Sequence, residues 1–136
     1  MSAHRPAIGT ASETPAEREA RIAQETRPLR HALRQSDRYT DLRGNHHELS
    51  AMSAADALLV LALLERHAET LHRGELAEHL VTAIAATSDA SRHGAIEAGR
   101  QAASLDAPAW LQQTPLHRAL RERAIQKEAN RRRRSK

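Results

Sequence analysis

The sequence lacks cysteine and phenylalanine altogether, and Trp110 and Tyr39 are its only large aromatic residues. Without cysteine the chain forms no disulfide scaffold, no thiolate zinc site and no cysteine nucleophile. This composition fits a reducing compartment, so we expect a cytoplasmic protein. Two large aromatic rings are also too few for a platform on which nucleic-acid bases stack, which argues against an RNA-recognition sheet or an OB fold.

Long hydrophobic runs are missing as well. The longest strictly apolar run covers residues 57–64, which is far short of the roughly 20 residues that a membrane-spanning helix needs. The first residues, MSAHRP, contain no apolar stretch typical of a signal peptide. We therefore expect neither a membrane span nor a signal peptide, and the length of 136 residues predicts a single domain.

The common signatures of enzymes and metal sites are absent. The five glycines are too few and too scattered to form a Gly-rich phosphate loop, and there is no Gly-x-Ser-x-Gly nucleophile motif. Glu69 and His72 have the Glu-x-x-His spacing of di-iron bundles, which need two such motifs, and only one is present. We interpret the nine histidines as surface residues, and Glu75 and Glu78 as acids on an exposed helix face. We expect a protein that is not an enzyme and has no metal or cofactor.

The residues that are abundant are helix formers. The chain has 27 Ala, 16 Leu and 19 Arg, but only 5 Ile and 2 Val. This bias predicts an all-α fold, a small bundle of four to five helices. We expect a flexible arm over residues 1–13, a helical domain over residues 14–125, and a basic tail over residues 126–136 that is disordered when free. A core of Ala and Leu is thin, so dimerisation would add burial.

Two Thr-Pro pairs mark the starts of the first and last helices. Thr14 is a candidate N-cap, Pro15 suits the first helical position and Glu17 completes a capping box. This helix is predicted to run to about Thr26, where Pro28 forces a kink or a restart. Leu29, Ala32 and Leu33 continue the helical stripe, which fades near Ser36. The segment of residues 38–43 is ambiguous, and we interpret Gly44 as a terminator.

The middle of the chain holds the clearest helix signal. Residues 57–64 are apolar on every face, which predicts a helix that is buried all round or that forms a subunit interface. The candidate interface residues are Leu58, Leu59, Leu61, Leu63 and Leu64. This helix is predicted to end near Gly74, and a second amphipathic helix to follow it up to residues 87–89. Asp89 is the candidate cap of a third helix over residues 90–103.

The last third of the chain contains a break and a basic helix. The Asp106-Ala107-Pro108 segment interrupts the helices, and we expect Trp110 and Leu111 to lie in a short turn that covers one end of the core. The last helix is predicted to begin at Thr114-Pro115, with a narrow apolar face that disappears past Ile125.

Residues 74–80, GELAEHL, resemble the Gly-x-Leu-Ala-x-x-Leu opening of helix-turn-helix units. The resemblance implies DNA binding through a second helix after a tight turn. Residues 81–84 continue the helical pattern instead, and the surrounding segment is acidic, so we do not assign this region to DNA binding.

The net charge of +4 is segregated along the chain. Counted from the sequence, residues 1–50 carry +1, residues 51–106 carry −4 and residues 107–136 carry +7. Arg-rich runs neutralise phosphates without reading sequence, so we predict a nucleic-acid-binding accessory protein. The predicted phosphate contacts are Arg118, Arg121, Arg123, Lys127, Arg131, Arg132, Arg133, Arg134 and Lys136. The alternative is a helical protein-interaction module, an adaptor, inhibitor or assembly subunit, whose tail meets an acidic protein surface.

Overall fold

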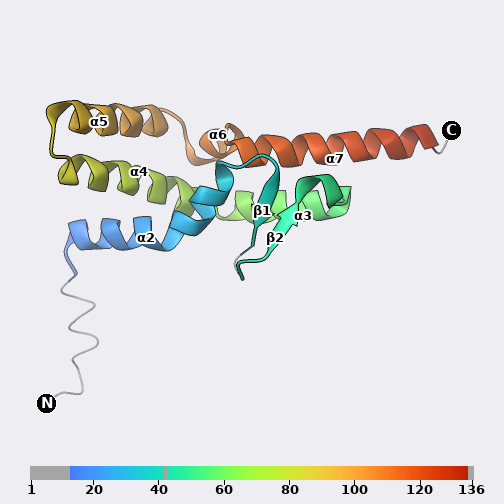
Figure 1. Cartoon of the computed structure of the whole chain (residues 1–136), viewed down its shortest axis with the longest axis horizontal. Coiled ribbons are helices and arrows are strands. Elements are labelled where there is room, and N and C mark those ends of the chain that lie inside the picture. Colours follow the sequence, from blue (N-terminus) through green and yellow to red (C-terminus); the bar gives the residue numbers. More distant parts are fainter. Residues whose placement is uncertain (1–12, 42, 135–136) are drawn as a thin grey trace, which may run out of the picture.

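The computed structural model describes residues 13–41 and 43–134, with side chains described through residue 125. The all-α prediction is confirmed, because this part of the chain consists of six α-helices, one 3-10 turn and a single two-stranded hairpin that lies beside α3 (Figure 1). The elements are α2 (Pro15–Leu33), β1 (Arg38–Thr40), β2 (His46–Glu48), η1 (Leu49–Ala51), α3 (Ala54–Arg66), α4 (Ala68–Ala85), α5 (Asp89–Ala103), α6 (Ala107–Gln112) and α7 (Pro115–Arg134). The predicted N-terminal arm falls almost entirely outside the described residues.

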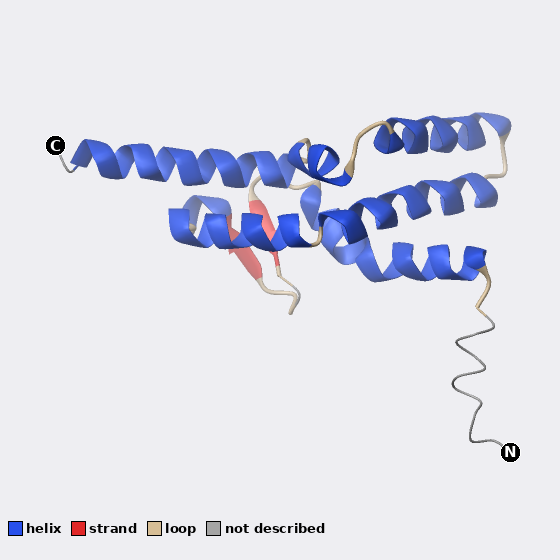
Figure 2. Ribbon diagram, turned by 180° about the vertical axis from the view of Figure 1, so that it is seen from behind, coloured by secondary structure: helices blue, strands red, loops and turns tan. Residues whose placement is uncertain are grey.

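The helices form two groups that meet at the junction of α3 and α4. In the first group α4 lies between α2 and α5, and in the second α3 lies alongside α7 (Figure 1). Seen from behind, the hairpin lies beside α3, and the end of α7 extends past every other element (Figure 2). The fully buried leucines come from α2, α3, α4, α6 and α7 and are Leu33, Leu64, Leu71, Leu111, Leu116 and Leu120.

Helix α2 begins as the sequence predicts. The Thr14 side chain accepts a hydrogen bond from the Glu17 backbone N–H, and the Glu17 carboxylate accepts one from the Thr14 N–H, which is a complete capping box. The helix then continues through Pro28 rather than restarting after it. Because proline cannot donate the intrahelical hydrogen bond, the ribbon bends part-way along α2 (Figure 1).

The predicted helix end at Gly74 is wrong. Helix α3 ends at Arg66 and α4 begins at Ala68, so Gly74 lies in the middle of α4, where it is buried. A Cβ atom at this position would lie 2.0 Å from Oγ1 of Thr26 and 3.1 Å from Nε of Arg30. Glycine is therefore needed because α2 crosses α4 at this point with no room for a side chain.

The expectation that α3 is buried on every side is also wrong within the single chain. Ala57, Leu61 and Leu64 are buried, whereas Leu58 and Leu59 are 58% and 69% exposed. Helix α3 packs against α7 on one side and lies at the edge of the molecule (Figure 1). An apolar helix at an edge keeps part of its apolar surface in solvent.

The ambiguous segment after α2 folds into the hairpin. Strands β1 and β2 pair antiparallel, with Tyr39 opposite His47, and Gly44 takes a φ of 86° in the turn. Asp41 accepts hydrogen bonds from His47 Nε2 at 2.9 Å and from the backbone N–H groups of Arg43 and Asn45. The hydrogen bond from His47 and those from the two backbone groups lower the pKa of Asp41 to about 2.

The second half of the chain differs from the prediction in three details. Ser88, rather than Asp89, caps α5, because its hydroxyl accepts from the Ser91 N–H. The predicted turn around Trp110 is the short helix α6, capped by Asp106. Helix α7 begins at Pro115 as predicted but runs on to Arg134. Residues 126–134 contain no glycine or proline to end a helix, and most are good helix formers.

The crossing at Gly74 predicts opposite effects for two glycine substitutions. Gly74→Ala should destabilise the protein by about 1–3 kcal/mol, because the new methyl group has no space. Gly94→Ala, within α5, should stabilise it by about 0.5–1 kcal/mol, because no described atom beyond the neighbouring backbone of α5 lies within 4 Å of the place that the new methyl group would take, and alanine favours the helix. Urea denaturation of both variants measures the two values, and equal effects would contradict the close crossing.

Candidate nucleic-acid interface

Apart from Arg123, the predicted phosphate contacts divide into three groups in the structure. Arg118 and Arg121 are exposed on α7, and no ion pair among the described residues involves either of them. Lys127 and Arg131, Arg132, Arg133 and Arg134 lie on the helical backbone of α7, and their side chains are outside the described part of the chain. Lys136 lies outside the described residues.

Arg123 has a structural role. Its Nε donates a 3.1 Å hydrogen bond to the carbonyl of Met52, and its Nη2 donates to the carbonyl of Ser50. Ser50 lies within η1 and Met52 directly follows it, just before α3. Arg123 therefore attaches α7 to the start of α3, and its guanidinium is occupied by the protein itself.

The candidate interface leucines are split by the structure. Leu61 and Leu64 belong to the hydrophobic core, and Leu63 is partly buried. Leu58 and Leu59 are exposed, but they are consecutive and so project about 100° apart around the helix. They do not form one continuous face.

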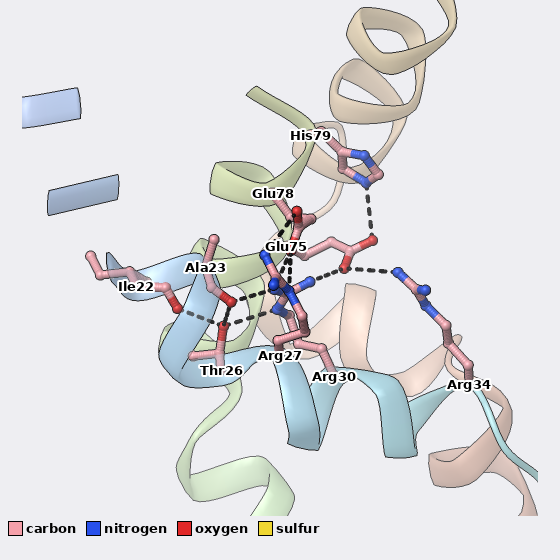
Figure 3. A network of polar contacts seen from close by, with 9 residues as sticks. All are labelled: Ile22, Ala23, Thr26, Arg27, Arg30, Arg34, Glu75, Glu78 and His79. Carbon is pink, nitrogen blue, oxygen red and sulfur yellow. Dashed lines mark hydrogen bonds and ion pairs between the residues drawn. The ribbon is translucent and has the colours of Figure 1, made fainter. Parts of the chain in front are cut away.

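The most extensive polar network lies where α2 crosses α4, and the sequence did not indicate it (Figure 3). The Arg30 side chain at its centre is only 3% exposed. It donates hydrogen bonds to Thr26 Oγ1 at 2.9 Å, to the Ala23 carbonyl at 2.6 Å, to Glu75 at 3.2 Å and to Glu78 at 3.0 Å. A buried guanidinium is tolerated only when its donors are satisfied in this way.

Glu75 and Glu78 are not the freely exposed acids that the sequence predicts. Both point toward α2, and Glu75 also accepts a hydrogen bond from His79 at 3.0 Å (Figure 3). Arg27 donates two hydrogen bonds to Glu78, at 3.0 and 3.3 Å. Partial burial raises the pKa of Glu78, but the hydrogen bonds from Arg30 and Arg27 outweigh it, so this pKa lies below its ordinary value of 4.5.

Every arginine of α2, α4 and α5, together with Arg34 just after α2, lies within 4 Å of a carboxylate. The pairs are Arg18 and Arg21 with Glu13, Arg27 and Arg30 with Glu78, Arg34 with Glu75, Arg73 with Glu19, Arg92 with Asp89 and Arg100 with Glu97. Among the described residues, the arginines without such a pair are on the hairpin, on α3 and on α7. The positive charge of α2, α4 and α5 is therefore locally balanced.

Two histidines are not the surface residues that the sequence predicts. His117 is 1% exposed, with its Nε2 at 3.2 Å from Glu65 and its Nδ1 without a hydrogen-bond partner among the described residues. His72 bonds the carbonyl of Ala102 and packs against the Trp110 ring. Within the described residues, no group of three or more His, Asp or Glu side chains is arranged to hold a metal ion.

No protein family, curated protein or solved structure matches this chain. In the part that the structure describes, none of the helices combines the length and the apolar character needed to cross a membrane.

Removing the buried guanidinium should cost more than removing an exposed one from the same helix. Arg30→Met should lower the free energy of unfolding by about 3 kcal/mol, because it leaves Glu75, Glu78 and Thr26 facing an apolar side chain. Arg21→Met, which removes two exposed ion pairs, should cost clearly less, because solvent screens both of them. Urea denaturation at neutral pH measures both, and a cost for Arg30→Met no larger than that for Arg21→Met would contradict the role of the network.

The lowered pKa of Glu78 predicts a stability that decreases in acid. Since the folded pKa lies below 4.5, the stabilisation is complete above pH 4.5 and is lost as the pH falls through the folded pKa. Glu78→Gln should therefore show a smaller decrease in stability between about pH 5 and pH 3 than the natural chain. Parallel curves of stability against pH for the two proteins would show that Glu78 is not one of the groups responsible.

Proposed function

We propose that this protein binds nucleic acid through the exposed basic side chains of α7 and of the residues that follow it, by contacts to phosphates. The observation that carries the proposal is the contrast between α7 and the body. The arginines of α2, α4 and α5 are paired with carboxylates, while Arg118 and Arg121 have no ion pair among the described residues. Residues 107–136 carry a formal charge of +7.

The shape of α7 supports the same function. Its 20 residues correspond to a helix of roughly 30 Å, and its end extends past α3 and the hairpin (Figures 1 and 2). An α-helix fits the major groove of B-form DNA, and a basic helix that extends from a body approaches phosphates without a clash of the body with the duplex. Arg123, near the middle of this helix, anchors it to the residues before α3.

The two large aromatic side chains support phosphate contacts over base stacking. Tyr39 is 4% exposed, and the Trp110 ring lies 5.2 Å from that of His72, centroid to centroid. Tyr39 is therefore buried, and Trp110 is partly buried against His72. Because phosphate contacts carry no sequence information, we propose binding that is non-specific.

A second candidate is a helical protein-interaction module. Six large aliphatic side chains are exposed in the described part of the chain, which favours a further surface for a protein partner. In this function the basic end of the chain would meet an acidic protein surface. The two functions differ in whether loss of the basic residues at this end changes affinity for nucleic acid.

Two variants test the first function. Replacing Arg131, Arg132, Arg133 and Arg134 by glutamine keeps the chain length and removes four positive charges. We expect affinity for duplex DNA to fall, and the slope of log affinity against log salt to decrease by up to about 4. Fluorescence anisotropy over a series of salt concentrations measures this slope.

The control replaces three exposed arginines outside α7 by glutamine. They have no ion pair among the described residues and are Arg38, Arg43 and Arg66. We expect this control to bind nearly as well as the natural chain. Equal binding by all three proteins, or no binding by the natural chain to duplex DNA or RNA at low salt, would contradict the proposed function.

A further inference from the structure

The part of the molecule formed by α5 and the second half of α4 has no large side chain in its interior. Helix α5 contributes no residue to the hydrophobic core cluster, and its one buried residue is Ala95. After Leu71, the buried residues of α4 are Gly74, Ala77 and Ala83. Three large aliphatic side chains here are exposed instead: Leu80 is 51% exposed, Ile84 69% and Ile96 46%.

The contacts between α4 and α5 show which residues of α4 lie beside Ile96. His72 bonds the carbonyl of Ala102, and a Cβ at Gly99 would lie 3.2 Å from the Cβ of His79, so the helices run antiparallel. Moving three residues back along α5, from Gly99 to Ile96, corresponds to moving about three residues forward along α4 from His79. Ile96 is therefore level with the turn between Leu80 and Ile84.

The three side chains also lie on the same side of the helix pair. Helix α4 contacts α2 through Gly74 and α5 through His79, and these two contacts are on opposite sides of it. At 100° per residue, Leu80 and Ile84 lie on the face between them, one turn apart. On α5, Ile96 is rotated in the same sense away from the contact at Gly99 as Leu80 and Ile84 are from the contact at His79. Because α5 runs antiparallel to α4, rotation in the same sense brings Ile96 to the same face. The three residues make one patch across two helices, which we call the α4–α5 patch.

We infer that the α4–α5 patch is the interface of a homodimer, in which two copies of the α4–α5 pair stack face to face about a two-fold axis. An antiparallel helix pair with one open apolar face is half of a four-helix bundle, and a second copy supplies the other half. This inference goes beyond the proposed contact with nucleic acid, and it moves the expected interface away from α3.

The charges around the α4–α5 patch favour a second copy over a partner of one charge sign. The turns of α5 on either side of Ile96 carry both signs of charge in the ion pairs Arg92–Asp89 and Arg100–Glu97. A surface that carries both signs matches itself when it is rotated by a two-fold axis. It does not match the uniform negative charge of nucleic acid.

The size of the patch sets the expected affinity. Three partly exposed aliphatic side chains supply less than the roughly 800 Å² that each partner contributes to an interface of standard size. The Ala-rich and charged surfaces next to them must make up the rest of the contact. We therefore expect a weak dimer, with a dissociation constant of the order of micromolar.

The position of the α4–α5 patch has a consequence for α7. Ile84 is the next to last residue of α4, at the end of the molecule opposite the end of α7 (Figure 1). A dimer through the patch leaves both α7 helices free and places two basic helices in one particle. Two linked binding elements raise the apparent affinity for a long polyanion without any new contact.

Sedimentation velocity of the full chain, without nucleic acid, tests the dimer over about 1–100 μM. We expect a mass that rises from 15.1 kDa toward twice that value. The test variant is Ile84→Lys, since lysine near a helix C-terminus is compatible with folding. The matched control is Leu59→Lys on α3, because both side chains are 69% exposed. Circular dichroism checks that both variants are folded.

The inference predicts a dimer for the natural chain and the control, and a monomer for Ile84→Lys and for a second variant, Ile96→Lys. Loss of the dimer only in Leu59→Lys would overturn it and assign the interface to α3. A natural chain that stays monomeric throughout the range would also overturn it. So would a dimer that forms only after removal of residues 1–12, because that segment would then be the occupant of the patch. None of these outcomes depends on whether the chain binds nucleic acid.

Discussion

The close crossing of α2 over α4 is the constraint on which the rest of the structure depends. Gly74 allows the two backbones to approach, and Thr26 and Arg30 fill the space that a larger residue would occupy. Because Arg30 is buried, α4 must present Glu75 and Glu78 to it, and this fixes the rotation of α4 about its own axis. The opposite side of α4 then faces α5, and the end of α2 carries Leu33 into the core.

The same crossing determines where positive charge is available. The carboxylates of α4 are used by Arg27, Arg30 and Arg34, so the arginine-rich helix α2 presents little unbalanced charge. The acidic segment of residues 51–106 therefore supplies carboxylates that neutralise arginines of the first helix. The arginines that remain without a carboxylate among the described residues include Arg118 and Arg121 of the last helix, which lies on the other side of the core and is anchored by Arg123. Packing neutralises the arginines of α2, and the sequence places most of the unpaired basic residues in the last segment of the chain.

Local signals predicted much of the fold, and distant contacts account for the errors. The capping box at Thr14 and the helix start at Pro115 depend on neighbours a few residues away, and both were predicted correctly. Gly74 has the same local pattern whether it ends a helix or allows a close crossing, and the deciding residue, Thr26, is far away in sequence. In the candidate site, the narrow apolar face of α7 indicates that Arg118 and Arg121 are exposed. The occupation of Arg123 by backbone carbonyls near residue 51 has no signal in its own segment.

The central claim is that phosphate contacts belong to α7 and not to the neutralised arginines of the body. Backbone amide chemical shifts of the isotope-labelled full chain, recorded while a short DNA duplex is added, test it most directly. The account predicts shifts from about residue 118 to the C-terminus, with the amides of α2 and α4 unchanged. Shifts centred on Arg27 and Arg34, with α7 unchanged, would contradict it.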